Sequence, residues 1–325
     1  MVWAYATLGY SSTQLFEKVA EVSIPQLRDF NSQAISNTVW AYATVGHSSP
    51  QLFDKIAEVA YPSIHKFNSL NIANTVWAYA TVGHSSPQLF EKIAEIAMPR
   101  LHEFNSQDIA FNSQDIANTV WAYATVGHCS PHLFNKVEKV ALPRLREFNS
   151  QALSNMVWAY ATLGYSSTQL FEKVAEVSIP QLRDFNSQAI SNTVWAYATV
   201  GHSSPQLFDK IAEVAYPSIH KFNSLNIANT VWAYAAVGQS SPKLFENTVW
   251  AYATVGHSSP QFFEKIVEIA LPRLHEFNSQ NIANTIWAYA TVGHSSPEIF
   301  DKAAEVALPR LDEFNSQAIA NMVWA

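Results

Sequence analysis

The chain has little of several residue types that mark common functional classes. Among its 325 residues there is one cysteine, Cys129, which excludes an internal disulfide and a zinc site built from several thiolates. Charged residues make up 14% of the chain and the net charge is -7. Because nonspecific nucleic-acid binding depends mostly on lysine and arginine, this balance argues against a general polyanion binder.

Membrane and catalytic signals are also missing. No uninterrupted apolar run reaches the ~18 residues that a membrane-spanning helix needs, so we expect no membrane partner. The sequence contains no Gly-rich phosphate loop, no HExxH and no GxSxG. Catalysis generally requires one cluster of unlike groups in a concave site. We therefore expect no enzyme activity, no cofactor, no metal and no small-molecule substrate.

Tryptophan and glycine, in contrast, recur in one repeated phrase. Successive tryptophans are 37 residues apart, except for one interval of 44 and one of 18. The longer interval holds a 7-residue insertion within 104–117, and the shorter one lacks 19 residues at the 246/247 junction. Residues 1–80 recur unchanged as residues 156–235. A fixed period of this length predicts a repeat array.

Each repeat is predicted to begin with an amphipathic helix, which we call helix A. In the repeat 68–104 it covers Asn71–Val82, where apolar residues recur at helical spacing opposite an uncharged polar face. Asn68 or Ser69 suits its N-cap. Gly83 suits its C-terminal end because glycine tolerates a left-handed conformation.

A second helix, helix B, is predicted to begin at Pro87 after a capping serine, Ser86. Pro99 should kink or briefly break it, because proline removes a helical hydrogen bond. All nineteen lysines and arginines lie on helix B segments. Two helices of this size cannot bury their own apolar faces, so copies must stack. The sequence therefore predicts an all-α fold, an α-solenoid of stacked 37-residue antiparallel helical hairpins that forms a single array over 1–325.

The irregular places in the array carry their own expectations. At the deletion, residues 242–255 should merge into one helix; at the insertion, helix A should lengthen or a loop should bulge. Both ends of the sequence fall inside helix A, whereas solenoids normally end in polar capping repeats. We therefore interpret the chain as a fragment of a longer array, in which no targeting peptide is visible.

One phrase carries a resemblance to a known class. Asn37-Thr38-Val39-Trp40-Ala41-Tyr42-Ala43-Thr44-Val45-Gly46, with Phe67-Asn68-Ser69 before the next copy, resembles the repeats of organellar RNA-binding proteins. These are the octotricopeptide repeats (OPR) of green algae, the related heptatricopeptide repeats, and the helical arrays that precede RAP domains in FAST-kinase-like proteins. The Asn-x-x-Trp-Ala-x-Ala-x-x-Gly pattern and the period match the heptatricopeptide class best. The sequence departs from the class in having no RAP domain, no basic tail and no Pro-Pro-Glu-Trp phrase.

The resemblance implies a function and a location. It implies sequence-selective binding of single-stranded RNA, with a role in RNA stabilisation, processing or translation in the mitochondrion or chloroplast. Repeat readers present two or three side chains to one base. The position six before each tryptophan varies inside an otherwise constant phrase and is the first candidate for base reading. Drift on a solvated face explains the variation equally well. The residues at this position are Ala34, Asn71, Asp115, Ala152, Ala189, Asn226, Asn281 and Ala318.

Secondary contacts are predicted on the same helix. Asn74, three before Trp77, either reads a base or bonds to neighbouring helices, and we favour the structural role because buried amides need partners. Thr75 shares its face, and Tyr79 on the rim either stacks under a base or packs on the next repeat. We expect the tryptophans to pack in the core, the lysines to lie on a mixed solvated face, and the turn histidines to serve the turn.

Two other classes remain open for the whole chain. The same architecture serves a protein-binding scaffold of the tetratricopeptide or HEAT type, which the net charge favours. A non-functional gene fragment is the third reading, because of the long duplication and the broken repeats.

Overall fold

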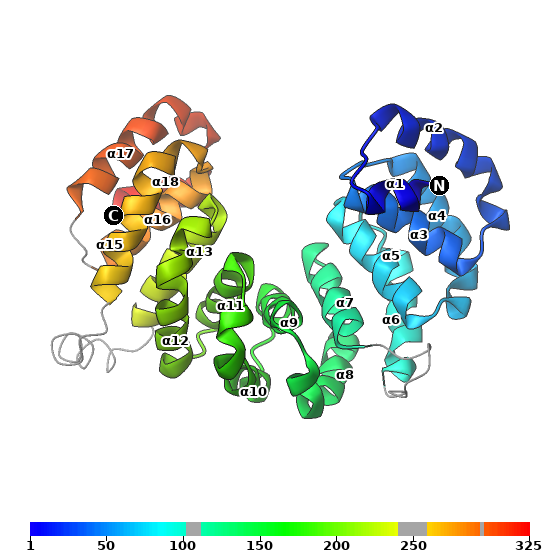
Figure 1. Ribbon diagram of the computed structural model, residues 1–325, viewed down its shortest axis with the longest axis horizontal. Coiled ribbons are helices and arrows are strands. Elements are labelled where there is room, and N and C mark those ends of the chain that lie inside the picture. The colour runs from blue at the N-terminus through cyan, green and yellow to red at the C-terminus, as the bar shows by residue number, and fades with distance from the viewer. Residues whose placement is uncertain (102–111, 240–258, 293–295) are drawn as a thin grey trace. The chain divides into compact units, whose positions relative to one another are not determined.

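The computed structural model describes residues 1–101, 112–239, 259–292 and 296–325 (Figure 1). Every regular element in these ranges is a helix, which confirms the predicted all-α solenoid class. The helices form two compact units, Met1–Leu163 and Gly164–Ala325. That they continue one another as a single array stays a prediction. None of the described helices has both the length and the apolar character that crossing a bilayer requires.

The first unit has two layers of helices. The helices A are α1 (Val2–Thr7), α3 (Ser32–Thr44), α5 (Ser69–Thr81), α7 (Ser113–Thr125) and α9 (Ser150–Thr162), and each packs along the next. The helices B form the second layer: α2 (Thr13–Ser23), α4 (Pro50–Ser63), α6 (Pro87–Arg100) and α8 (Pro131–Ala141). Short 3-10 helices follow at η1 (Ile24–Asp29), η2 (Ile64–Lys66) and η3 (Leu142–Glu147).

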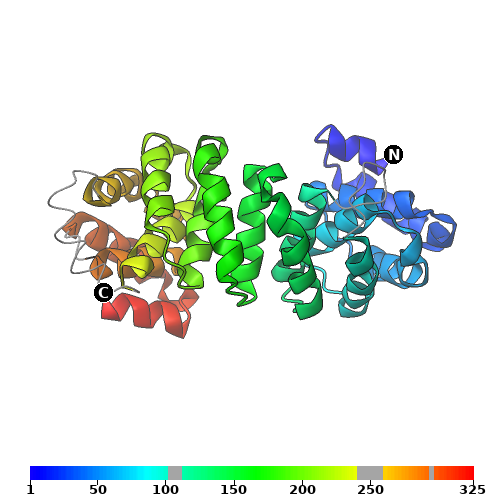
Figure 2. The same cartoon turned by 90° about the horizontal axis from the view of Figure 1, so that it is seen from below.

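The second unit repeats this arrangement, and Figure 2 shows the hairpins of each unit lying side by side. Its helices A are α11 (Ser187–Thr199), α13 (Ser224–Gln239), α16 (Ser279–Thr291) and α18 (Ser316–Trp324). Its helices B are α10 (Thr168–Ser178), α12 (Pro205–Ala215), α15 (Ser259–Ala270) and α17 (Pro297–Ala307). The 3-10 helices are η4 (Ile179–Asp184), η5 (Tyr216–Lys221), η6 (Leu271–Glu276) and η7 (Leu308–Glu313).

The ends of helix A follow the predicted local signals. The Asn68 side chain accepts a hydrogen bond from the backbone N–H of Asn71 at 2.7 Å, so Asn68 is the N-cap of α5. Gly83 takes a left-handed conformation with a φ of 68° just after the helix. Capping asparagine and turning glycine thus set the length of helix A.

Helix B begins at proline as predicted, but the serine before it plays a smaller part. Ser86 precedes Pro87 without a capping bond from its side chain, whereas Ser12, which precedes Thr13, accepts one from the Leu15 N–H at 3.4 Å. Pro99, where the sequence predicts a kink or brief break, lies inside α6, which continues to Arg100 without a change of helix type. In other hairpins the helix type changes at the equivalent proline. In the fourth hairpin α8 ends at Ala141, and Pro143 lies in the first turn of η3.

The irregular repeats can be followed only in part. Helix α7 begins after Asn112 and has 13 residues, the same length as α5, so the described part of this helix A is not lengthened by the insertion. Residues 102–111 and the expected merged helix 242–255 lie outside the described residues. Helix α13 differs from its counterparts, because it continues through Gly238 to Gln239 where a turn was predicted.

A tyrosine on helix A joins it to the helix B before it. Tyr79 is fully buried, its ring meets Phe53 edge-on, and its hydroxyl donates to the Phe53 carbonyl at 2.7 Å. The same bond recurs in both units, from Tyr42, Tyr123, Tyr160, Tyr197, Tyr234 and Tyr289. The predicted rim position is therefore wrong for Tyr79. Helix A is covered by the preceding helix B as well as by its own hairpin partner, and a wheel drawn for one helix does not contain that neighbour.

Candidate nucleic-acid interface

Helix A leaves one narrow face open, and four positions form it. They lie seven and three residues before tryptophan, at tryptophan itself, and four residues after it, a spacing that places them on one side of a helix. In α5 they are Leu70, Asn74, Trp77 and Thr81. We call these four positions, taken over the described helices A of each unit, the Asn-Trp stripe. The first and last are mostly exposed, and the middle two are mostly half-buried.

The tryptophans are a surface row, which corrects the core position expected from the sequence. They are half-buried at Trp40, Trp77, Trp121, Trp158, Trp195, Trp232 and Trp287. The ring centroids of Trp121 and Trp158 are 6.4 Å apart with the planes inclined by 34°, and those of Trp287 and Trp324 are 6.1 Å apart at 35°. In each of these two pairs the indoles of successive helices A thus lie next to each other within one unit.

Amide side chains flank this aromatic row. Gln114 Nε2 donates to Asn118 Oδ1 at 2.8 Å, and the same bond joins Gln280 to Asn284 at 2.8 Å and Gln317 to Asn321 at 2.9 Å. In these three helices the asparagine therefore bonds within its own helix and not across to a neighbour. Leu70 and Leu225 replace the glutamine in α5 and α13, where they are 52% and 50% exposed.

The position six before tryptophan lies one residue away from this face and points elsewhere. Asn71, Asp115, Asn226 and Asn281 are 5–6% exposed, Ala152, Ala189 and Ala318 are buried, and Ala34 is half-buried. The expectation of a solvated face is wrong here, because the neighbouring helix A covers the position. Asn71 Nδ2 donates to Ser36 Oγ on α3 at 3.0 Å, and Asn226 makes the same bond to Ser191 on α11. Their role in base reading stays a prediction.

The three secondary candidates separate in the structure. Asn74 lies on the stripe and is half-buried. Thr75 is fully buried, and its hydroxyl donates to the Asn71 carbonyl at 2.7 Å. The Tyr79 hydroxyl is engaged by its hydrogen bond to the Phe53 carbonyl. Of the three, only Asn74 is placed to meet a ligand without a rearrangement.

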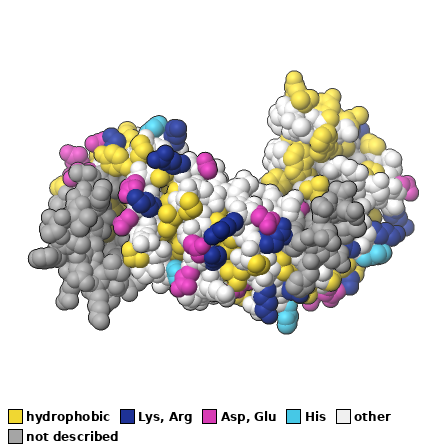
Figure 3. Space-filling view, turned by 60° about the horizontal axis from the view of Figure 1, so that its bottom comes forward, with side chains coloured by type: hydrophobic (Ala, Val, Ile, Leu, Met, Phe, Trp, Pro, Cys, Tyr) yellow, Lys and Arg dark blue, Asp and Glu magenta, His cyan; other side chains and the backbone are white. Residues whose placement is uncertain are grey.

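Charge is segregated from the stripe. None of the four stripe positions carries a charged residue in the described helices A. Acidic and basic side chains lie intermixed on the face shown in Figure 3. On most of the described helices B a lysine pairs with a glutamate three residues later, as Lys92 does with Glu95 at 2.6 Å. A mixed, solvated face is what the sequence predicts for these lysines.

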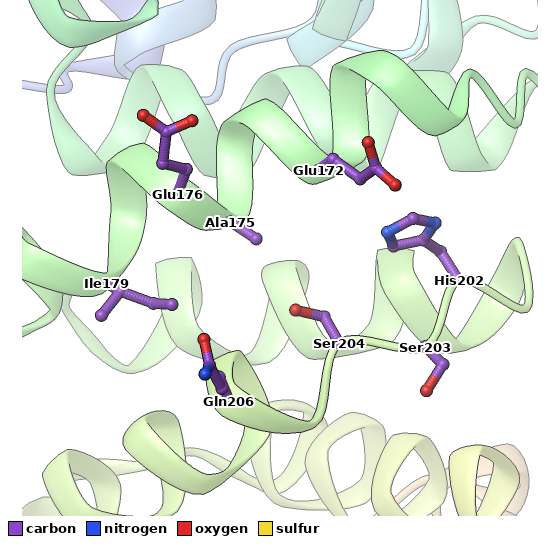
Figure 4. Close-up of a pocket in the computed structure, with 8 residues that line it drawn as sticks. All are labelled: Glu172, Ala175, Glu176, Ile179, His202, Ser203, Ser204 and Gln206. Carbon is purple, nitrogen blue, oxygen red and sulfur yellow. The ribbon is translucent and has the colours of Figure 1, made fainter.

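The turn histidines line the joints between hairpins. A cavity of about 400 Å³ in the second unit lies between α10 and the turn before α12, and Figure 4 shows the Glu172 carboxylate directed toward the His202 ring. His202 packs on Phe171 and Tyr197, with centroid distances of 5.8 and 5.6 Å. Burial lowers the pKa of His202, and the Glu172 charge opposes that shift. No group of three metal-binding side chains gathers in the described part of the chain.

Comparison with known proteins places the chain in a family. The family described as RNA-editing substrate-binding complex 6 protein matches residues 1–110 and 108–248, more than half of the chain. Two short segments, 274–286 and 311–323, match a family described as a protein of unknown function. No curated protein matches the sequence. With its repeated helical hairpins, the chain belongs to the family of RNA-editing substrate-binding complex 6 proteins.

Proposed function

We propose that the Asn-Trp stripe binds single-stranded RNA, with bases stacked on the tryptophan row. The observation that carries the proposal is the row of half-buried indoles with amide side chains beside it, repeated on successive helices A. Every base has a π-face, so stacking on aromatic side chains suits a single strand whose bases are unpaired. The family's name, which refers to an RNA-editing substrate-binding complex, supports RNA as the ligand.

Sequence selectivity would arise from the amides of the stripe. Asparagine and glutamine offer both donors and acceptors to the edges of a base. The asparagine is constant, whereas the position seven before tryptophan changes from glutamine to leucine at Leu70 and Leu225. Because Leu70 and Leu225 are exposed and carry no hydrogen-bonding group, their repeats present a different edge to the RNA. Selectivity therefore belongs to this position in our proposal, and no longer first to Asn71 and its equivalents.

The biological setting is proposed at a coarser level. An RNA-editing complex is compatible with a mitochondrial location, which we propose in place of the chloroplast, and it implies protein partners as well as RNA. Within such an assembly the chain would hold RNA for processing without catalysing a reaction. A close relation to the heptatricopeptide and octotricopeptide repeats is part of the same proposal.

One observation favours a second candidate, an extended peptide. The stripe has no lysine or arginine to neutralise phosphate, and a row of amides can bond to peptide groups as readily as to bases. A scaffold that grips an extended segment of a protein partner would use the same indoles as pockets for side chains. The binding experiment therefore needs a readout specific to RNA.

The test measures binding of the purified chain to a randomised single-stranded RNA pool. Binding is monitored by fluorescence anisotropy at two salt concentrations. Duplex RNA and single-stranded DNA serve as competitors, and the bound RNA is sequenced. We expect binding to the single-stranded pool with enriched sequences, because stacking and base-edge bonds need unpaired bases. A folded, helical chain that binds none of the three nucleic acids would refute RNA binding and favour the peptide.

A further inference from the structure

Lysine charge on helix B is cancelled in a regular way. In seven of the described helices B one lysine pairs with a glutamate three residues later on the same face: Lys18–Glu21, Lys55–Glu58, Lys92–Glu95, Lys173–Glu176, Lys210–Glu213, Lys265–Glu268 and Lys302–Glu305. An aspartate or glutamate also precedes each of these lysines directly. These seven lysines attract a polyanion only weakly, because each of them has an acid beside it.

Helix α8 departs from the pattern at both positions that are acidic in the other helices B, the one before the lysine and the one three residues after it. Lys139 stands where the pairing glutamate would be, and Asn135 replaces the acid before Lys136. Lys136 is half-buried and Lys139 is exposed, and neither makes an ion pair with another described residue. The segment 131–147 holds four lysines and arginines against two glutamates. The corresponding described segments of the other repeats are neutral or acidic.

The two lysines extend along one edge of α8. His132, Lys136 and Lys139 are spaced by four and three residues, so they follow one another along a single face of the helix. His132 and Lys139 are exposed. Glu138 is next to Lys139 in the sequence but is half-buried and lies off this row. We call His132, Lys136 and Lys139 the α8 cationic row.

We propose that the α8 cationic row binds phosphates of the single-stranded RNA chain. It would supply the electrostatic contact that the uncharged Asn-Trp stripe lacks, and it would do so without regard to base sequence, because phosphates are the same at every nucleotide. The inference rests on the proposed function, since it names RNA as the occupant. RNA fits better than a folded acidic protein, because two adjacent lysines suit a ligand with charge repeated along its length.

The test is the salt dependence of RNA affinity in Lys139→Glu. This substitution restores the lysine–glutamate pair that seven other helices B carry, so we expect the variant to fold as the wild type does. Two phosphate contacts would be lost: the contact of Lys139 itself, and that of Lys136, because the introduced glutamate would form an ion pair with Lys136. For a single strand, the magnitude of the negative slope of log affinity against log salt concentration should then be smaller by about 1.4 than in the wild type. The affinity near 0.2 M salt should be roughly tenfold weaker than that of the wild type. Circular dichroism checks the fold, and Lys139→Gln provides a second variant with a smaller change of the same sign.

The matched control is Lys92→Gln, which removes a charge that Glu95 already cancels and should leave the slope unchanged. If the wild type binds the RNA pool and Lys139→Glu shows the same salt slope as the wild type, the inference about the α8 cationic row is overturned and the proposed function is not. No binding by the wild type would overturn both this inference and the proposed function. Binding of polyglutamate that is lost in Lys139→Glu, with RNA affinity unaffected, would assign the row to an acidic protein partner and also overturn the inference.

Discussion

At the scale of single residues, a side chain that varies between repeats need not touch a ligand. The residue six before tryptophan is the third residue of helix A, and its backbone N–H bonds to the capping asparagine whatever its side chain is. Asn71 and Asp115 add a reciprocal bond back to the cap, whereas Ala34 does not. Alanine, asparagine and aspartate can therefore all fill this position, which is buried under a neighbouring helix A.

Asp115 offers a test of that structural role. Burial raises the pKa of its carboxyl, and the hydrogen bond from the Asn112 backbone opposes the shift. A carboxyl that binds protons more readily when folded weakens the fold once pH exceeds its folded pKa. Asp115→Asn keeps the capping bond, as Asn71 does, and removes the buried charge. We expect a higher urea midpoint at pH 7 and a gain that shrinks as pH falls through the raised pKa of Asp115 toward the ordinary value of aspartate.

The same variant also addresses base reading. If the side chain at 115 reads a base, Asp115→Asn should change the RNA sequences that the chain enriches. Unchanged enrichment together with the altered stability would assign the position to the fold.

A second residue-scale prediction concerns pH and the turn histidine His202. Its pKa is lowered by burial, so the unfolded chain takes up this proton first as pH falls through the ordinary histidine value of about 6.5. Stability contributed at this joint is therefore present above that value and decreases below it. Glu172 faces the ring and limits the loss. We expect the thermal midpoint to drop between about pH 7.5 and 5.5.

The variant His202→Tyr isolates this contribution. Tyrosine occupies the same turn position at Tyr10 and Tyr165, so the substitution is one that the repeat already contains. A smaller pH-dependent drop in His202→Tyr than in the wild type would support the linkage, and equal drops would exclude His202 as its source.

At the scale of elements, identical sequence takes different environments. Residues 1–80 and 156–235 are the same, yet Tyr5 is 42% exposed and Tyr160 is 1% exposed. Tyr160 lies under α8 and donates to the Phe134 carbonyl, whereas the described chain has no helix B before α1 to cover Tyr5. Burial of helix A is therefore a property of the stack and not of the hairpin.

This dependence explains how far the sequence predicts the fold. Asn68, Gly83 and Pro87 act through local hydrogen bonding and backbone conformation, so the bounds of the helices follow from sequence. The open face does not, because three sides of helix A are covered by different neighbours. A single wheel places Trp77 in the core and Asn71 outside, whereas the structure leaves Trp77 half-buried and buries Asn71. The signal that could have found the stripe was the spacing of four, three and four residues among side chains that are never charged.

The tryptophan row leads to a prediction for RNA affinity. Stacking of a base on an aromatic side chain contributes about 1–3 kcal/mol, so Trp121→Ala and Trp158→Ala should each weaken binding by roughly tenfold. Affinity is measured by anisotropy with an RNA selected from the pool. The control is Tyr61→Leu, which removes an exposed aromatic residue from helix B and places there a residue found in other repeats. Equal losses in control and test variants would argue against a specific role of the row.

At the scale of the whole molecule, charge and aromatic surface are divided between the two layers of helices in each unit. In the described ranges helices A present an uncharged aromatic face, and the lysines and arginines lie on helices B and the 3-10 helices that follow them, with most of the lysines in neutral pairs. A net charge of -7 is thus compatible with RNA binding, because base stacking does not require a basic surface. The α8 cationic row is the exception on the second layer, and its contribution is separable through salt.

The most direct measurement is photocrosslinking of the chain to single-stranded RNA that contains 4-thiouridine, with the adducts located by mass spectrometry. The account predicts adducts on helix A, at the tryptophans and the asparagines three residues before them, and a weaker set on α8. Adducts confined to helices B other than α8, or adducts on helix A at the buried position of Asn71 without any on the tryptophan row, would contradict it.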